Sequence, residues 1–410
     1  MEREAVLVAI DVGTSKVVTL IGEVTRDGGL NIIGKGAPPS AGLKKGVVIN
    51  IDQTVASIAG AVDQAERLSG YKLDAAFVGV GGSHVESQNS RGVVVVSGPG
   101  KGVTWGGVAR ATEVARAVTI PSNREVLHVL PRGYLVDGQE GVKDPLGMSA
   151  IRLEVETHIV HASATAVQNL SKCVRQAGVQ IDELVAASLA ASEAVLTDTE
   201  KDLGVGVVDI GAGTTDMAFF LDGSPFRTSV LPVGGNNVTN DVAIGLKTSL
   251  GPAQDLKHRY GTCDLSSVDP EQELIVETIG EPGGRTVPRL ELCGIIEARM
   301  REVFEKLGDE IGSGGRGLLP AGLVLTGGAA QLGGVAQLGR EVLQMPVRVA
   351  GPNGVGGLVD HLMTPAYSTS IGLLLWGARA VTQADVRRYE SAPAHGSLGR
   401  MRDWVRNLFP

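Results

Sequence analysis

Residues 203–220, LGVGVVDIGAGTTDMAFF, contain the pattern that decides the fold. Two apolar runs flank a turn that follows Asp209 and contains glycine and threonine. Short apolar runs bounded by turn residues are typical of buried strands, so we expect strands over Val205–Ile210 and Met217–Leu221. Glycine in the turn between them would let the backbone approach a bound group closely.

The same design occurs once more, near the start of the chain. Residues 5–20 read AVLVAIDVGTSKVVTL, again with an aspartate and a turn of glycine and threonine between apolar runs. Asp11 and Asp209 lie 198 residues apart, a spacing far longer than the roughly 20 to 50 residues of a solenoid repeat. We therefore predict two similarly folded halves. Because predicted strands and helices are mixed in both halves, the fold class is α/β.

Each turn can direct several backbone N–H groups into one concavity, a geometry that binds phosphate oxygens. The residues that could take part are Gly13, Thr14, Ser15, Lys16, Gly211, Gly213, Thr214 and Thr215. Asp11 and Asp209 would repel a phosphate, but they suit a Mg²⁺ ion held through water, because Mg²⁺ uses one or two carboxylates together with phosphates. The alternative is two ordinary hairpin turns, since Asp and Gly are common in turns.

A third glycine turn follows the apolar run Leu323–Leu325. It reads Thr326-Gly327-Gly328-Ala329-Ala330, and a helix is predicted from about Val335. Small side chains at Gly327, Gly328 and Ala329 would let a flat ring lie against the backbone, although a tight strand-to-helix turn explains them equally. The pattern Gly-x-x-x-x-Gly-Lys-Ser/Thr does not occur, which argues against a P-loop NTPase.

Composition narrows the class of protein. The chain has 410 residues, 43% of them hydrophobic, which is enough for a large core without disulfides. Its formal charge of −8 argues against broad nucleic-acid binding. Cys173, Cys263 and Cys293 form no Cys-x-x-Cys pair, so we expect neither disulfides nor a zinc site, as suits a reducing cytoplasm. We expect no secretory signal and no membrane-spanning helix.

The three turns resemble the phosphate-1, phosphate-2 and adenosine motifs of the superfamily that contains actin, hexokinase and the heat-shock chaperone ATPases. Residues 188–196, SLAASEAVL, and 365–372, PAYSTSIG, resemble its two connecting helices. Within that superfamily the chain resembles the bacterial cell-division family FtsA along most of its length. Examples are GVVINIDQTVASIAGAVDQAERLSG at 46–70 and LPVGGNNVTNDVAIGL at 231–246.

The resemblance implies an actin-like two-lobed α/β fold, with duplicated mixed-sheet domains around a nucleotide cleft, an inserted subdomain and a C-terminal amphipathic helix. The implied segments are 1–82 and 163–203 (subdomain 1A), 83–162 (inserted subdomain 1C), 204–233 and 309–360 (2A), 234–308 (2B), 361–381 (return helix to 1A), 382–397 (linker) and 398–410 (membrane-targeting helix).

The resemblance also implies that ATP and Mg²⁺ bind in the cleft. Two positions depart from the family pattern: Ala212 stands where a third glycine is usual, and Gln254 stands where a ribose-binding Glu is frequent. The Ala212 methyl group should be tolerated if φ there is negative. Lys257 contacts either the adenosine or only solvent.

Glu193, on the first connecting helix, is the candidate for positioning an attacking water, with a salt-bridged glutamate as the alternative. Whether ATP is hydrolysed is left open. His84, His158 and His161 show no metal-binding pattern, so we interpret them as structural.

Residues 398–410 have the pattern of an interfacial helix. At 100° per residue one face collects Leu398, Met401, Trp404, Val405, Leu408 and Phe409. The other face carries three arginines and a single aspartate. Aromatic residues opposite cations are typical of helices that lie on anionic membranes, and a helix docked on the protein's own core is the alternative.

The resemblance, together with the tail pattern, implies an actin-like ATP-binding protein that polymerises on the cytoplasmic side of the cell membrane, at the division site. The resemblance implies that it tethers filaments of FtsZ through the FtsZ C-terminal tail, contacts other division proteins and helps to assemble the septum. Arg299, Arg301 and Lys306 in 2B are candidate contacts for an acidic tail. The alternatives are an actin-like pilus-assembly ATPase and a small-molecule kinase of the same superfamily.

Overall fold

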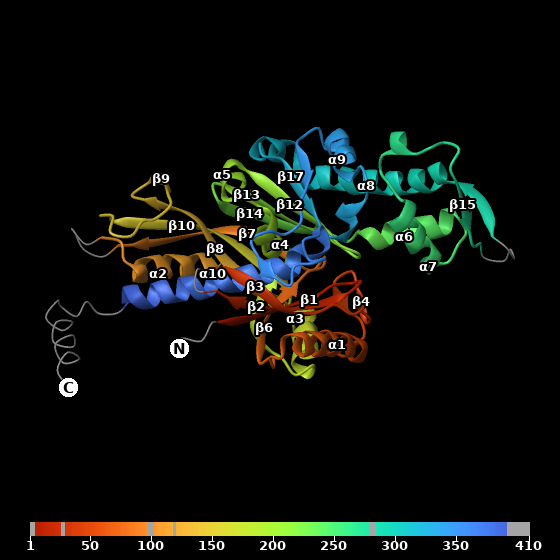
Figure 1. Cartoon of the computed structure of the whole chain (residues 1–410). Helices are drawn as coiled ribbons and strands as arrows, with labels where there is room; N and C mark the ends of the chain where they lie inside the picture. The colour runs from red at the N-terminus through yellow and green to blue at the C-terminus, as the bar shows by residue number, and fades with distance from the viewer. Residues whose placement is uncertain (1–4, 26–28, 97–101, 118–119, 279–283, 392–410) are drawn as a thin grey trace.

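The computed structural model of the chain describes residues 5–25, 29–96, 102–117, 120–278 and 284–391. These residues form two lobes, each with its own mixed β-sheet, and a third sheet to one side (Figure 1). The first-lobe sheet has the order β11-β6-β1-β2-β3-β19 and contains β1 (Val6–Val12), β2 (Val17–Val24), β3 (Leu30–Gly36), β6 (Ala75–Val80), β11 (Gln180–Ala186) and β19 (Gly356–Gly357). The second-lobe sheet has the order β14-β13-β12-β17-β18 and contains β12 (Val205–Ile210), β13 (Thr215–Leu221), β14 (Ser224–Leu231), β17 (Leu323–Thr326) and β18 (Val347–Val349).

Helices cover both faces of each main sheet. In the first lobe, α1 (Ile51–Ser69) and α3 (Ala164–Gln176) pack on the outer face. In the second lobe the outer side holds α6 (Gly235–Gly245), α7 (Leu250–Tyr260), α8 (Arg289–Gly315) and α9 (Val335–Leu343). Between the sheets lie α4 (Ala187–Val195) and α10 (Ser368–Ser391), and a short helix, α5 (Asp198–Leu203), follows α4. Two small hairpins complete the lobes: β4 (Leu43–Lys44) with β5 (Val47–Val48), and β15 (Glu273–Val276) with β16 (Arg285–Pro288).

The two lobes repeat one strand plan. In the first lobe β1, β2 and β3 form an antiparallel meander and β6 runs parallel to β1. In the second lobe β12, β13 and β14 form the same meander and β17 runs parallel to β12. The last pairs before the two hairpin turns, Val12 with Val17 and Ile210 with Thr215, differ by 198 residues on both strands. The duplication predicted from the sequence is therefore present at the level of strand register.

The connection between the lobes is a crossing of two helices. α10 packs on the first-lobe sheet and α4 on the second-lobe sheet, and their apolar side chains share one buried core with both sheets. The helices touch at Gly372, where a Cβ atom would lie 1.8 Å from the Ala190 carbonyl oxygen. Only glycine allows this approach, because any side chain would have to overlap backbone atoms.

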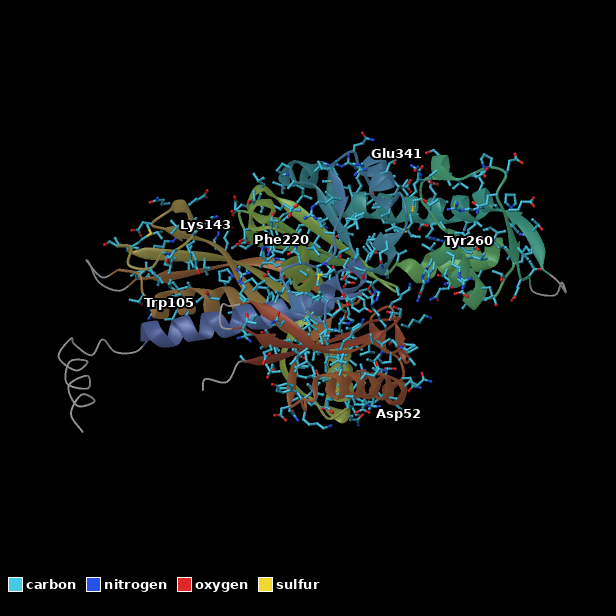
Figure 2. All side chains as sticks on the ribbon, in the orientation of Figure 1. Asp52, Trp105, Lys143, Phe220, Tyr260 and Glu341 are labelled. Atoms are coloured by element: carbon cyan, nitrogen blue, oxygen red, sulfur yellow. The ribbon has the colours of Figure 1, made fainter. Side chains whose placement is uncertain are left out.

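The inserted domain carries the third sheet, of order β7-β10-β8-β9, with α2 (Trp105–Arg116) packed against it. Its strands are β7 (Glu86–Val95), β8 (Arg124–Val136), β9 (Gln139–Val142) and β10 (Arg152–Ser163). Trp105 and Lys143 lie on this domain at the opposite end of the molecule from Tyr260 (Figure 2). His128 of β8 anchors the domain to the first lobe: its Nε2 accepts the Ala186 N–H at 3.0 Å, and its ring lies 5.1 Å from that of Trp376.

The inserted domain also forms hydrogen bonds with the second lobe along the outer edge of β14. Ser87 Oγ donates to the Thr228 carbonyl at 2.8 Å and accepts the Thr228 N–H at 2.9 Å. Asn89 Nδ2 donates to the Phe226 carbonyl at 3.0 Å. His158 lies between Asn89 Oδ1 (2.8 Å) and Thr228 Oγ1 (2.9 Å), and its burial lowers its pKa to about 3. We call these five residues the β7–β14 seam.

Three elements differ from the sequence expectation. The apolar run at 93–96 predicts a short strand there, but β7 runs from Glu86 to Val95, because its polar half also pairs with β10 although it lacks an apolar alternation. The apolar pattern of residues 184–196 predicts one helix, but α4 begins only at Ala187, since the apolar residues before it form the end of β11 beside β6. The linker expected from Thr382 is wrong in its first part: α10 continues to Ser391, through residues that include no proline or glycine.

Residues 398–410, which carry the predicted amphipathic helix, lie outside the described residues, as do 392–397 of the predicted linker. Across the ranges that the structure describes, no helix combines the length and the apolar content needed to cross a bilayer.

Candidate functional site

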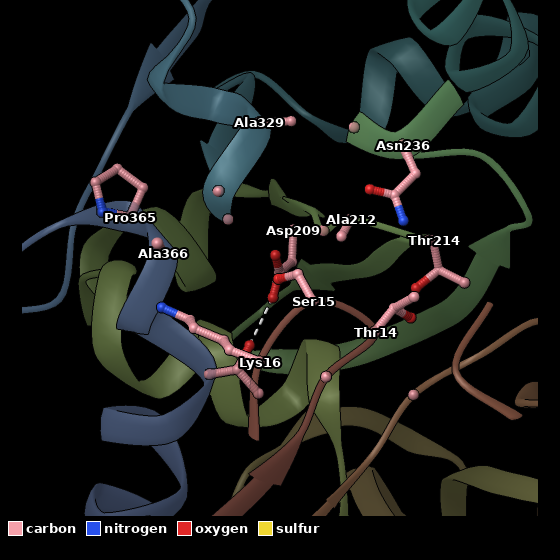
Figure 3. A pocket seen from close by; sticks show the side chains of 18 of the residues that line it. Thr14, Ser15, Lys16, Asp209, Ala212, Thr214, Asn236, Ala329, Pro365 and Ala366 are labelled. Carbon is pink, nitrogen blue, oxygen red and sulfur yellow. Dashed lines mark hydrogen bonds between the residues drawn. The ribbon is translucent and has the colours of Figure 1, made fainter. Parts of the chain in front are cut away.

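A cleft of about 530 Å³ lies between the two lobes. It brings together every residue that the sequence predicted for cofactor binding except Thr215: Asp11, Gly13, Thr14, Ser15, Lys16, Asp209, Gly211, Gly213, Thr214, Gln254, Lys257, Gly327, Gly328 and Ala329. Figure 3 shows Thr14 and Thr214 close to one another, with Asp209 and Ser15 in the same space. Segments from both halves of the chain therefore form one site.

The two hairpin turns have the same internal geometry. The Gly13 N–H donates to the Lys16 carbonyl at 3.1 Å, and the Gly211 N–H donates to the Thr214 carbonyl at 2.9 Å. The turns also meet face to face, because a Cβ atom on Gly213 would lie 2.7 Å from Thr14 Oγ1. Ala212 has no positive φ, so its methyl group is accommodated as the sequence analysis required.

Thr215 has a structural place and does not line the cleft. It is fully buried on β13, and its hydroxyl donates to the Val233 carbonyl at 2.9 Å. The second turn is supported from behind by the start of α6: the Gly235 N–H donates to the Gly211 carbonyl at 2.9 Å, and the Asn236 N–H to the Ala212 carbonyl at 2.8 Å. Thr215 thus helps to hold β13, the strand that follows the turn, in place.

Three carboxyl groups face the inside of the cleft. Burial, with repulsion from Asp209, raises the pKa of Asp11 to about 7, and burial chiefly raises the pKa of Asp216 to about 7. Burial also raises the pKa of Asp209, against a hydrogen bond from Thr369 that lowers it. In the described part of the chain, no group of three or more His, Cys, Asp or Glu side chains is arranged to hold a metal ion. Buried carboxylates that repel one another fit a cation held jointly with phosphate and water better than an all-protein metal site.

The third turn fits against the second-lobe aspartate. Gly327 has a φ of 87°, and a Cβ atom there would lie 2.2 Å from Asp209 Oδ1 and 2.6 Å from the Ile210 carbonyl oxygen. Gly328 has open space at the same position. The sequence analysis gave both glycines the same role, but only Gly327 is required by the backbone.

The two lysines of the candidate site are both engaged by protein groups. Lys16 Nζ lies 3.4 Å from the centre of the Tyr367 ring, and burial lowers its pKa; Figure 3 shows this side chain reaching toward Ala366. Lys257 Nζ donates to Thr239 Oγ1 at 2.8 Å and to the Gly235 carbonyl at 3.1 Å. Burial lowers the pKa of Lys257 to about 8. Lys257 is therefore neither solvated nor free: it ties α7 to the start of α6.

Glu193 lies away from the cleft. Its Oε1 accepts from Lys201 Nζ at 3.0 Å, and its Oε2 from Arg379 Nη1 at 3.2 Å. It is not among the residues that line the cleft. This corrects the sequence interpretation: α4 turns that side chain toward two cations, so we do not carry a catalytic role for Glu193 further.

Several lining residues were missed by the sequence analysis. Asp216 stands at the end of the quoted turn, where an aspartate is a common turn residue and gives no signal of its own for a place in the cleft. Asn236, His258 and Thr369 also line the cleft. They come from α6, α7 and α10; Asn236 and Thr369 lie in segments that carry the family resemblance, but no local pattern marks these side chains as part of the cleft.

The candidate surface in 2B is covered by ion pairs. Arg299 binds Asp241 and Glu302, while Arg301 contacts Glu297 at 2.7 Å and Glu341 at 2.9 Å. Lys306 Nζ lies 3.1 Å from Glu302 Oε1. An acidic partner would have to compete with these carboxylates. Each single arginine should therefore contribute less to binding an acidic peptide than the sequence suggested.

Comparison with known proteins agrees with this architecture. The family model "Cell division protein FtsA" matches residues 206–372, and "SHS2 domain inserted in FTSA" matches residues 82–161. The cell division protein FtsA of Pseudomonas aeruginosa is 42% identical over 411 residues and 98% of both chains. Those of Bacillus subtilis and Escherichia coli are 41% and 35% identical, over 92% and 98% of this chain and 85% and 98% of their own.

Solved structures show the same fold at low identity. The PilM-PilN type IV pilus biogenesis complex aligns with a TM-score of 0.66 and 17% identity, over 92% of this chain and 99% of that one. MreB5 of Spiroplasma citri bound to ADP aligns with a TM-score of 0.55 and 12% identity, over 95% and 99%. These likenesses confirm the actin-like two-lobed fold and say nothing of a pilus function. The family follows from the curated relatives, which match almost end to end: this chain belongs to the family of cell division protein FtsA.

Proposed function

We propose that the chain binds ATP with Mg²⁺ in its cleft, polymerises on the cytoplasmic face of the cell membrane and tethers FtsZ filaments there for septum assembly. One observation carries the nucleotide part: two hairpin turns of the same geometry face each other across a cleft lined by small residues. Backbone nests of this kind bind phosphate. MreB5, whose fold is the same, has been solved with ADP and with AMPPNP.

The residues of the cleft fit a Mg-nucleotide. The turns at Gly13 and Gly211 would hold phosphate oxygens, and Asp11 and Asp209 would hold the ion through water. The ion supplies positive charge that offsets both the phosphates and the buried carboxyl groups. The turn at Gly327 would support the adenosine, with Gln254 of α7 offering an uncharged hydrogen bond to the ribose.

Isothermal titration calorimetry with Mg-ATP tests the nucleotide proposal. Gly213→Val should abolish binding, because its side chain would overlap Thr14 and fill the space between the turns. Gly133→Val is the matched control: no atom lies within 4 Å of a Cβ there, and the residue lies in the inserted domain. Equal affinity for ATP in wild type and Gly213→Val would refute this role of the turns.

The partner part of the proposal assigns binding of the acidic FtsZ tail to residues 234–308. Because Arg299 and Arg301 already hold carboxylates, reversing both should weaken binding of a labelled tail peptide by more than either single change. Arg227→Glu is a matched control, since Arg227 pairs with Glu310 but lies on β14, outside 234–308. Fluorescence anisotropy that gives wild-type affinity for the double reversal would remove this surface from the proposal.

The membrane part rests on the sequence pattern of residues 398–410. So short a helix would bind weakly alone, and self-association into filaments would raise the avidity without any new contact. MamK, a neighbour of the same fold with a TM-score of 0.50, has been solved as a double helical filament. Sedimentation with anionic liposomes, with and without FtsZ and ATP, would test both steps together.

A further inference from the structure

The start of α10 touches the second-lobe aspartate and the third turn at once. The Gly327 N–H donates to the Pro365 carbonyl at 3.0 Å, and the hydroxyl groups of Thr326 and Ser368 lie 2.6 Å apart. The next residue, Thr369, donates its hydroxyl to Asp209 Oδ2 at 2.5 Å; in Figure 3 the dashed line at the labelled Asp209 marks this bond. Thr369 also lines the cleft.

These contacts hold the Asp209 carboxylate from two sides. Oδ2 accepts the Thr369 hydroxyl, while Oδ1 lies against the Cα of Gly327, where there is no room for a Cβ atom. A carboxylate has about four lone-pair sites, so one hydrogen bond leaves acceptor capacity directed into the cleft. The side chain of Asp209 is thus restrained in rotation, and its carboxylate can still accept further hydrogen bonds.

The equivalent aspartate of the first lobe has no such support. Asp11 occupies the same place on β1 as Asp209 does on β12. Within the described ranges, the Asp11 carboxylate accepts no hydrogen bond, and the positive charge that acts on it is that of Lys16. The two aspartates of the duplicated motif, identical in sequence context, therefore differ in how firmly they are held.

Resting on the proposed function, we propose that Thr369 is a positioning residue for the divalent cation that accompanies the nucleotide. Its hydroxyl keeps the Asp209 carboxylate turned toward the space between the turns, so the ion and its waters meet an oriented acceptor. Oriented ligand-supporting hydrogen bonds of this kind strengthen metal sites, and their loss typically weakens them by about 10- to 100-fold. Because α10 packs on the first-lobe sheet and Asp209 belongs to the second lobe, the hydrogen bond also joins the two lobes at the cleft.

The test measures how much Mg²⁺ tightens ATP binding, as the ratio of the dissociation constants in EDTA and in Mg²⁺. Thr369→Val keeps the volume and removes the hydroxyl, and it should reduce this ratio by about tenfold while leaving the affinity in EDTA unchanged. Thr369→Ser restores the hydroxyl and should return the ratio to within about twofold of wild type. Ser370→Ala is the matched control, because the Ser370 hydroxyl donates to the carbonyl of Tyr367, just before α10, and Ser370 does not line the cleft.

Each outcome decides the proposal. A wild-type ratio in Thr369→Val overturns it, and so does an equal loss of affinity in EDTA and in Mg²⁺, which would mean that Thr369 only supports the fold. If thermal unfolding shows that the valine variant is not folded, Thr369→Ala takes its place beside Thr369→Ser. If wild type binds no ATP at all, the proposed function fails, and this inference fails with it; ATP binding in wild type with an unchanged ratio in the variant refutes the inference alone.

Discussion

Single residues decide whether the turns of the cleft can form. Gly327 and Gly328 are neighbours of the same type, and they differ only in their surroundings. The left-handed backbone at Gly327 and the absence of space beside Asp209 both exclude a side chain, whereas Gly328 is open. The sequence shows two adjacent glycines here. Only the fold reveals that Gly327 must be glycine and that Gly328 can be replaced.

Gly327→Ala should therefore lower the free energy of unfolding by about 1–3 kcal/mol or more, from backbone strain and overlap with Asp209. Gly328→Ala should stay within about 0.5 kcal/mol of wild type, because its methyl group meets no atom within 4 Å. Urea unfolding of both variants without nucleotide measures the difference. Equal stabilities would contradict the close approach seen at Gly327.

The buried carboxyl group of Asp216 should make stability depend on pH. Its folded pKa of about 7 lies above the ordinary value of 3.8, so the folded state holds a proton that the unfolded state has lost between these values. Stability should fall as pH rises from about 4 to 7, because the unfolded state binds fewer protons there. Asp216→Asn should make this fall shallower, by up to about 1.4 kcal/mol per pH unit.

Urea unfolding in EDTA at several pH values between 4 and 8 measures the effect, and wild type and variant are compared at each pH. Subtracting the two curves removes the contributions of titrating groups that do not interact with Asp216, and leaves those of Asp216 and of the neighbouring Asp11 and Asp209. Identical slopes for wild type and Asp216→Asn would show that Asp216 ionises normally in the folded protein.

At the scale of elements, the sequence predicted the strands and helices that have a clear apolar pattern of their own. It did not predict those that depend on pairing with distant strands. β1, β2, β12 and β13 were found because each is a short apolar run beside a glycine turn. β7 was only half found, because its polar residues are held by β10 and by the β7–β14 seam. The last three residues of β11 were taken as helix, since an apolar run that continues into α4 gives no sign of the parallel strand beside it.

The seam offers a prediction about how elements are joined. Ser87→Ala removes two hydrogen bonds to Thr228 and leaves its backbone N–H and carbonyl without those partners, which should cost about 1–3 kcal/mol. Ser90→Ala is the control, because in the described structure its side chain makes no hydrogen bond. Thermal unfolding of both variants would settle the matter; similar midpoints would mean that the seam is not a stabilising contact.

At the scale of the whole molecule, the duplication and the two phosphate-type turns were readable from the sequence, because each turn is local. The residues that complete the cleft were not readable. His258 and Thr369 are far in sequence from the turns they meet; the segment around Thr369 resembles a connecting helix, but that resemblance does not single out Thr369 as a cleft residue. Glu193 was misplaced for the same reason: helical position alone did not reveal the two cations beside it.

The tail prediction also belongs at this scale, since it concerns where the molecule resides. Trp404→Glu, or deletion of residues 398–410, should release the protein from anionic liposomes without loss of ATP binding. Each apolar side chain buried in the interface contributes roughly 1.5–3 kcal/mol. Arg402→Ala should weaken attachment only modestly and mainly at low salt, because a surface arginine adds about 1 kcal/mol.

Co-sedimentation with vesicles at two salt concentrations measures this, with calorimetry of ATP binding as the control for folding. Full sedimentation of the truncated chain would move the membrane contact elsewhere or remove it from the proposed function.

The two lobes differ in the chain that follows the strand parallel to the first strand of each meander, and this makes the two ends of the cleft unequal. Both β6 and β17 run into a pair of glycines, but Gly81 and Gly82 lead straight into the inserted domain, and the Gly82 N–H lies 3.4 Å from Asp216 Oδ1. Gly81, Gly327 and Gly328 all line the cleft, but the chain after Gly328 stays in the second lobe and continues into α9. The internal repeat is therefore exact only up to these glycines, so the two ends of the cleft differ in chemistry and an elongated ligand would meet a different surface at each end.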